Sequence, residues 1–190
     1  MTLMTHIKIK RPLIARYVLF VLALIVPALI LSATSTAEGE SHGREIRQID
    51  RMHTAIKAKI RAEKLIESKR TFEYCEPYAD TLRVMHADNR GVIRHYRVEG
   101  GSEDSSVRRD FYYDGQGRLG LALIEGRAAN DTLMRYRIHY GREGHRIRVS
   151  HKQVRGPGYT FPSALSEQDV IRDPLQAFHS KNPCLEITRP

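Results

Sequence analysis

The pattern of hydrophobic and polar positions changes period within the chain. Apolar side chains recur at helical spacing over 42–69, with no glycine or proline between Arg44 and Arg70, which predicts one long amphipathic helix. Over 71–154 the pattern becomes short alternating runs separated by turn residues, typical of an antiparallel sheet. We expect strands at 71–77, 80–87, 92–99, 107–113, 118–125, 132–140 and 146–154.

Three of the predicted turns share one chemistry. Each four-residue segment ends in glycine, which adopts the positive φ that hairpin loops require. The segments are 88–91, 114–117 and 141–144, and their starts lie 26 and 27 residues apart. This spacing indicates a weak internal repeat of one β-hairpin per unit.

The alternation places many apolar side chains on one face of the sheet. They are Val107, Phe111, Tyr113, Leu119, Leu121, Leu123, Met134, Tyr136, Ile138, Tyr140, Ile147 and Val149. The helix at 42–69 is the natural cover for this face, because an open sheet must bury its apolar side. The predicted fold is therefore α+β, with one long N-terminal helix packed on an antiparallel meander of about six or seven strands. In an alternative, the basic back of this helix lies on a membrane or an anionic polymer.

Residues 1–37 have the three parts of a secretory leader. A basic start is followed by an uncharged run at 17–31 and by small residues ending at Ala37. The mature protein would then begin near Glu38 and be periplasmic or secreted. The alternative is an uncleaved anchor, although the run is shorter than the roughly 20 apolar residues that span a bilayer. The basic residues of the start are Lys8, Lys10, Arg11 and Arg16.

The leader changes the charge of the mature protein. The whole chain has 31 Lys and Arg and 22 Asp and Glu, a net charge of +9. Subtracting the four basic residues of the leader leaves 27 against 22, a net charge of +5. Basic character must therefore be argued from local clusters of residues. About 150 residues remain, the size of one ordinary domain.

Cys75 and Cys184 are the only cysteines of the chain. In an exported protein this even count predicts one disulfide, which would fasten the irregular segment 155–190 to the first strand. The cysteines lie 109 positions apart, a loop for which the chain-entropy model gives at most about 4–5 kcal/mol of stabilisation. Within the segment, Asp173 and Pro174 predict a short helix at 174–180, with Asp173 as its N-cap.

The hairpin around 114–117 carries a family resemblance. Its sequence Tyr113-Asp114-Gly115-Gln116-Gly117-Arg118 resembles the tyrosine–aspartate (YD) repeat, and 136–144 resembles a decayed second copy with Gly141 in place of the aspartate. Large proteins of that family build closed β-shells from dozens of copies, so two or three copies imply only local hairpin geometry. The layout of leader, helix and meander is also similar to that of small exported bacterial proteins, which implies no activity.

Five basic residues are predicted to gather on the sheet face opposite the core. Arg135, Arg137 and His139 project from one strand, and Arg146 and Arg148 project from its neighbour on the same side. Like charges opposite one another destabilise a sheet, so something must offset them. In one interpretation, Asp110, Glu99 or Glu125 neutralises part of the face. In the other, the face binds a polyanion, because the arginine fork meets phosphate or carboxylate with two hydrogen bonds.

No motif points to catalysis or to a cofactor. GxSxG, HExxH and phosphate-binding loops are absent from the sequence. His139, His145 and His151 recur every six residues, but alternation places His139 and His151 on opposite faces, so we expect no metal site. His86 and His95 are expected to lie close together, with no carboxylate placed to orient either.

The predicted organisation is a signal peptide at 1–37, a helical part at 38–70, the meander at 71–154 and the irregular segment at 155–190. We expect a non-catalytic envelope protein whose basic face contacts an anionic polymer such as lipopolysaccharide phosphate or an acidic glycan. The alternatives are a protein-interaction module, either an inhibitor or an assembly factor, that uses the helix or a sheet edge, and a hydrolase with an unrecognised site. Nucleic acid is not an expected partner, and a membrane is one only through an uncleaved leader.

Overall fold

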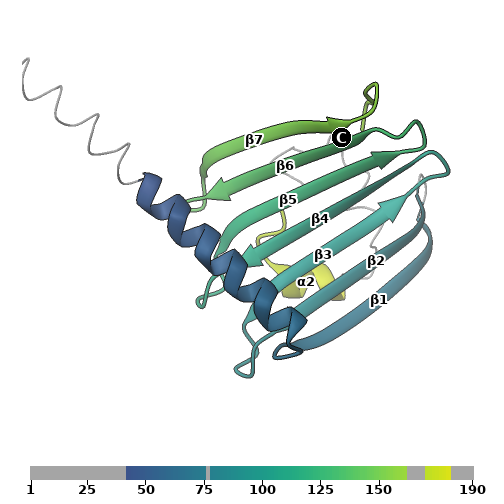
Figure 1. Cartoon of the computed structure of the whole chain (residues 1–190). Coiled ribbons are helices and arrows are strands. Elements are labelled where there is room, and N and C mark those ends of the chain that lie inside the picture. Colours follow the sequence, from purple (N-terminus) through teal and green to yellow (C-terminus); the bar gives the residue numbers. More distant parts are fainter. Residues whose placement is uncertain (1–41, 76–77, 162–169, 181–190) are drawn as a thin grey trace, which may run out of the picture. The chain divides into compact units, whose positions relative to one another are not determined.

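The computed structural model describes residues 42–75, 78–161 and 170–180, and from Arg44 onward these belong to one compact unit. Within them, seven strands form one antiparallel sheet in sequence order, which confirms the predicted meander (Figure 1). The strands are β1 (Ile66–Cys75), β2 (Tyr78–Ala87), β3 (Ile93–Gly101), β4 (Ser105–Tyr113), β5 (Leu119–Ala128), β6 (Leu133–Tyr140) and β7 (Arg146–Arg155), and they are followed by the short helix α2 (Pro174–His179).

The three glycine-ended turns form as predicted. Gly91, Gly117 and Gly144 have φ of 80°, 78° and 84°, and each donates its backbone N–H to the carbonyl three residues earlier. A fourth turn of the same kind at 128–131 was not predicted. There Asp131 takes the left-handed position with φ 68°, so the glycine signal is missing from the sequence.

The N-terminal helix ends earlier than predicted, because the last helical residue is 61 and β1 begins at Ile66. The helix ends in a Schellman motif centred on Glu63, whose φ is 53°. The N–H of Glu63 donates to the carbonyl of Ile60 at 3.0 Å, and the N–H of Lys64 donates to that of Lys59 at 2.9 Å. No glycine or proline marks the end of the helix in the sequence. The prediction followed the spacing of apolar residues alone and therefore placed the end of the helix too late.

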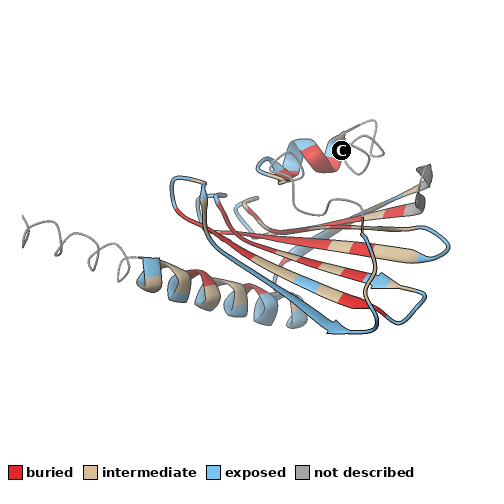
Figure 2. Cartoon of the chain, turned by 90° about the horizontal axis from the view of Figure 1, so that it is seen from above, coloured by how far each residue is buried: buried red, intermediate tan, exposed pale blue. Residues whose placement is uncertain are grey.

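The helix covers a different face of the sheet from the one predicted. Ile49 and Ile56 pack against Tyr112 and Leu121, whereas the predicted core residue Phe111 lies on the other face. Figure 2 shows the helix and α2 on opposite sides of the sheet. The sheet is therefore the middle layer of three.

A register shift explains why the predicted apolar set divides between two faces. Tyr113 pairs with Leu119 and Tyr112 pairs with Leu121, so Gly120 is an extra residue in β5. The bulge reverses the alternation, and Leu119 therefore packs in the cluster of Phe111, while Leu121 packs against the helix. A second shift, between His139 and Tyr140, similarly separates Ile147 from the predicted set.

The C-terminal segment covers the second face. Asp173 caps α2 by accepting from the N–H of Gln176 at 2.9 Å, as predicted, and Ala177 and Phe178 pack on the sheet. Arg83, which is fully buried, donates to the carbonyl of Ala177.

Further contacts hold this segment along its length. Arg70 donates to the carbonyl of Phe178 at 2.6 Å, and the hydroxyl of Tyr113 donates to that of Ile171 at 2.8 Å. Phe161 lies directly on Gly126, where a Cβ would approach the ring to 2.9 Å. The glycine of β5 thus leaves the space that this aromatic ring occupies.

Two predictions fall on parts of the chain outside the described residues. They are the leader at 1–37 and the disulfide, since Cys184 and the side chain of Cys75 are not described. Both stay predictions. No helix in the described ranges is long and apolar enough to cross a membrane.

Candidate anion-binding groove

A groove of about 630 Å³ lies beside the helix on the sheet face that the helix covers. The helix contributes His53 and Lys57 to its wall, and the remaining lining comes from β3 to β7. Leu123 and Tyr112 add apolar surface. The charged and polar lining residues from the sheet are Arg97, Arg108, Asp110, Glu125, Arg135, Arg137, Ser150, His151 and Lys152.

The groove has an excess of positive charge. Six of its lining side chains are lysine or arginine, and two are carboxylates, Asp110 and Glu125. Lys57 and Lys152 are exposed, and neither forms an ion pair with any residue that the structure describes. Both lysines can therefore contact an anion in the groove without first breaking an ion pair with a described carboxylate.

Asp110 organises one side of the groove. It is buried, and its Oδ1 accepts from His95 Nε2 at 2.8 Å and from Arg97 Nε at 2.8 Å. Arg108 Nε lies 3.1 Å from Oδ2. Burial by itself raises the pKa of this carboxyl, but the hydrogen bonds and charges of His95 and Arg97 outweigh burial and lower the pKa to about 2. Asp110 is thus a permanent negative charge beneath the basic wall.

Glu125 has the corresponding role on the other side. Its Oε1 accepts from Arg127 at 2.7 Å, and its Oε2 accepts from Arg135 at 2.8 Å. Burial raises the pKa of Glu125, and the hydrogen bonds from Arg135 and Arg127 outweigh this and lower it. The predicted neutralisation of the face by Asp110 and Glu125 is therefore present, and it is partial.

Four of the five residues predicted to bind a polyanion share one sheet face, since Arg148 pairs with His139, but only two of them line the groove. Arg135 and Arg137 line the groove, whereas His139 is buried at 2 % exposure and bonds to Asp50 of the helix at 2.9 Å. Arg146 and Arg148 are not among the groove's lining residues. Because of the register shift between His139 and Tyr140, Arg146 pairs with Tyr140. Arg146 therefore does not share the face of the other predicted basic residues.

Asp50 was missed by the sequence analysis, although it holds two of the predicted residues. Arg137 Nη2 lies 2.5 Å from its Oδ1, which also accepts from His139 Nε2. Burial raises the pKa of Asp50, but the hydrogen bonds from Arg137 and His139 outweigh it and lower the pKa. Asp50 directly follows Ile49, one of the apolar residues of the helix. This position suggests a contact with the sheet only when the sheet face that the helix covers is already known.

Lys57, Lys152, Arg97 and Arg108 were also missed. Lys57 lies on the basic back of the helix, which was not expected to face the sheet. Arg97 and Arg108 lie outside the two strands considered, and Lys152 lies on the second of these strands but was not included. Arg97 pairs with Asp110 in the register of β3 and β4. The sequence of that hairpin therefore contains this ion pair, provided that the register is known.

Two histidines lie next to the groove. His86 Nδ1 is 3.0 Å from His95 Nδ1, and His86 Nε2 is 3.1 Å from Glu67. With Asp110 on the far side of His95, both rings face a carboxylate, so the prediction that no carboxylate orients them is wrong. The pKa of His86 is lowered, first by burial and then by the charge of His95.

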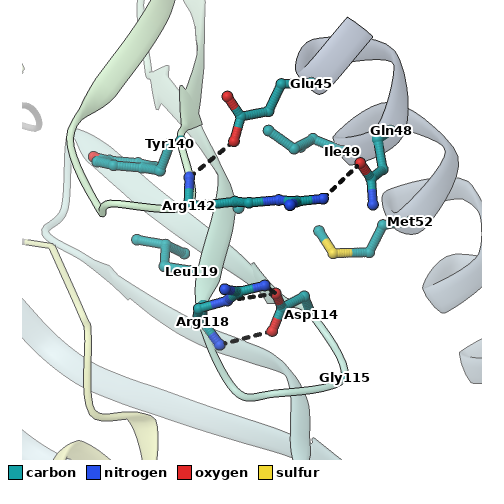
Figure 3. A pocket seen from close by; sticks show the side chains of 12 residues that line it. Glu45, Gln48, Ile49, Met52, Asp114, Gly115, Arg118, Leu119, Tyr140 and Arg142 are labelled. Atoms are coloured by element: carbon teal, nitrogen blue, oxygen red, sulfur yellow. Dashed lines mark hydrogen bonds and ion pairs between the residues drawn. The ribbon is translucent and has the colours of Figure 1, made fainter. Parts of the chain in front are cut away.

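A smaller pocket of about 260 Å³ lies between the helix and two of the glycine-ended turns (Figure 3). Arg142 donates its backbone N–H to Glu45 at 2.9 Å, and its guanidinium lies 3.5 Å from Gln48. Asp114 and Arg118 form an ion pair at 2.7 Å within one turn. These polar groups bond to one another. The contacts of Arg142 with Glu45 and Gln48 hold the helix against the turn at 141–144.

Among the described residues, no three His, Cys, Asp or Glu side chains form a group that could hold a metal ion. Comparisons of the chain with models of protein families, with curated proteins and with solved structures find no match.

Proposed function

We propose that this protein is a non-catalytic, exported envelope protein that binds an anionic polymer through the groove beside the helix. The observation that carries this proposal is the set of six lysine and arginine side chains around one hollow that contains two carboxylates. Such an excess attracts sulfate, phosphate or carboxylate groups, and arginine suits them because its fork donates two parallel hydrogen bonds.

The shape of the groove supports a ligand with charged groups on a compact body. Tyr112 and Leu123 provide apolar surface between the basic walls. Sugars of an acidic glycan or of lipopolysaccharide present anionic groups on such a body, and each neutralised charge releases counterions. Binding is therefore expected to weaken steeply as salt is added.

Charge reversal at Lys57 and Lys152, which form no ion pair with the described residues, tests the proposal. In the protein beginning at Glu38, Lys57→Glu with Lys152→Glu should lower the salt concentration that elutes the protein from heparin–agarose. The matched control, Lys59→Glu with Lys64→Glu, makes the same change of charge at exposed residues outside the groove lining.

The control variant should elute close to the wild type. Equal loss of retention in both variants would mean that heparin senses net charge alone. A wild-type protein that is not retained at low salt would remove the proposal altogether.

A second candidate function is protein binding at the β7 edge. This edge strand exposes Val149 and Val154 at 50 % and 37 %, and an extended segment of a partner can add to an open edge. Because β7 also carries Arg148, Lys152 and Arg155, an acidic segment suits it best. Binding through backbone hydrogen bonds would depend less on salt than binding in the groove.

A further inference from the structure

Four side chains form a continuous chain from the sheet edge to the groove. Glu67 of β1 contacts His86 Nε2 at 3.1 Å, His86 Nδ1 contacts His95 Nδ1 at 3.0 Å, and His95 Nε2 contacts Asp110 at 2.8 Å. Both histidines are buried, His95 at 1 % exposure. Asp110 is also a lining residue of the groove, so the chain ends at the proposed binding site.

A count of protons shows what the complete chain requires. Each of the three contacts needs one proton between its two heavy atoms. Carboxylates supply none, and a neutral imidazole has one N–H. Two neutral histidines therefore fill two of the three hydrogen bonds. The complete chain holds one additional proton, which the two rings share as a single imidazolium charge.

When that proton is absent, the hydrogen bond at the Glu67 end is the weakest point. Asp110 stays ionised because its pKa is about 2, and it holds the N–H of His95. The single N–H of His86 can then donate to His95 or to Glu67, but not to both. The Glu67 side chain is 44 % exposed and also contacts Lys69 Nζ at 2.8 Å, so it can leave His86 without losing its charge partner.

Asp110 couples this chain to the groove. Its carboxylate accepts from His95 and also holds the guanidiniums of Arg97 and Arg108. An anion that draws Arg97 and Arg108 toward itself leaves less positive charge beside the carboxylate of Asp110. A proton on the histidine pair replaces this positive charge next to Asp110. Binding of the anion and binding of the proton therefore favour each other.

Other charged groups face this region from the helix and from β4. Asp50 is engaged by Arg137 and His139, and Lys57 adds positive charge at the groove. The ring of His53 packs against Tyr112 at 4.5 Å, and burial, followed by the charge of Arg137, lowers the pKa of His53 to about 4. Burial raises the pKa of Tyr112, which stays neutral. His53 and Tyr112 therefore do not compete with the histidine pair for a proton in mildly acid solution.

We infer that His86 and His95 take up the proton that accompanies anion binding in the groove, so the protein binds its anionic ligand more tightly as the pH falls below neutrality. This inference rests on the proposed function and adds a regulatory link to the same site. With one linked proton, affinity should rise by at most about tenfold per pH unit.

Calorimetry with sucrose octasulfate tests the link, because its sulfate esters do not titrate in this range. Titrations at pH 6.5 in two buffers of different ionisation enthalpy measure the protons taken up per bound anion. The wild type should take up a fraction of one proton. His86→Gln should still bind the anion but take up none.

His145→Gln is the matched control, because His145 is an exposed histidine outside the groove lining. This variant should keep the proton uptake of the wild type. His151→Gln removes the histidine that lines the groove itself, and proton uptake should persist in that variant too. Uptake that disappears with His151, or binding without uptake in the wild type, would overturn the inference and leave the proposed function standing. No binding to the wild type would instead overturn the proposed function.

If His86→Gln does not fold, the ¹⁵N shifts of the wild-type imidazoles give the same information. The pKa of the histidine pair should rise when sucrose octasulfate is bound, and an unchanged pKa would contradict the inference.

Discussion

Two carboxylates let basic side chains occupy neighbouring strands of this sheet. Asp110 holds Arg97, Arg108 and His95, and Asp50 holds Arg137 and His139. The sequence showed the accumulation of arginine and the need to offset it, and it named Asp110. It could not show Asp50, because that contact depends on how the helix lies on the sheet.

Asp110 should make stability depend on pH in the acid range. Its pKa is about 2 in the folded protein and near the ordinary value of 3.8 in the unfolded chain. The unfolded state therefore binds the proton first, and the stabilisation is complete above about pH 4 and lost as pH falls toward 2. The difference corresponds to about 2 kcal/mol. Urea unfolding at pH 6, 4 and 3 should show that the free energy of unfolding falls less with decreasing pH in Asp110→Asn than in the wild type.

Asp131→Asn is the control for this measurement, because Asp131 is an exposed turn residue whose ion pair with Arg155 lies in solvent. Its pH dependence should follow that of the wild type. The same slope in Asp110→Asn and the wild type would show that Asp110 is not held as described.

At the scale of elements, turn chemistry and alternation were enough to place the strands but not their faces. The extra residue Gly120 in β5 reverses the alternation at its position. A glycine inside a strand often marks a bulge, but the prediction did not use this signal. Leu119 and Leu121 were therefore assigned to one face, and the helix to the wrong side. The prediction found Arg135 and Arg137 of the groove, because β6 is regular there, but it missed Lys57, which reaches the groove only from the covered face.

The end of the helix offers a direct test at this scale. Glu63 has a φ of 53°, which costs free energy for a residue with a Cβ and none for glycine. Glu63→Gly should therefore stabilise the protein by about 0.5–1 kcal/mol, although glycine also loses more entropy on folding. Glu63→Val should destabilise it. Thermal unfolding measures both, and a destabilised glycine variant would contradict the Schellman geometry.

At the scale of the molecule, two unrelated segments cover the two faces of one sheet. The helix closes one face, and the segment around α2 closes the other through contacts such as that of Arg83 with Ala177. Composition and alternation predicted a sheet with one cover. The second cover was not predicted, because a segment rich in proline and glycine has no periodic signal.

The predicted disulfide belongs to this scale, since it would fasten the C-terminal cover to β1. The protein beginning at Glu38 should show no free thiol when unfolded without reductant. Reduction should lower the free energy of unfolding by at most about 4–5 kcal/mol. Two titratable thiols in the purified protein would contradict the disulfide.

The most direct test of the central claim maps the bound anion onto the molecule. The ¹⁵N-labelled protein beginning at Glu38 is titrated with sucrose octasulfate at low salt, and backbone amide shifts are followed. The account predicts the largest changes around the groove, at Arg97, Asp110, Leu123, Arg137 and Ser150. Changes confined to the smaller pocket near Arg118 and Arg142, or to the outer edge of β7, would contradict it.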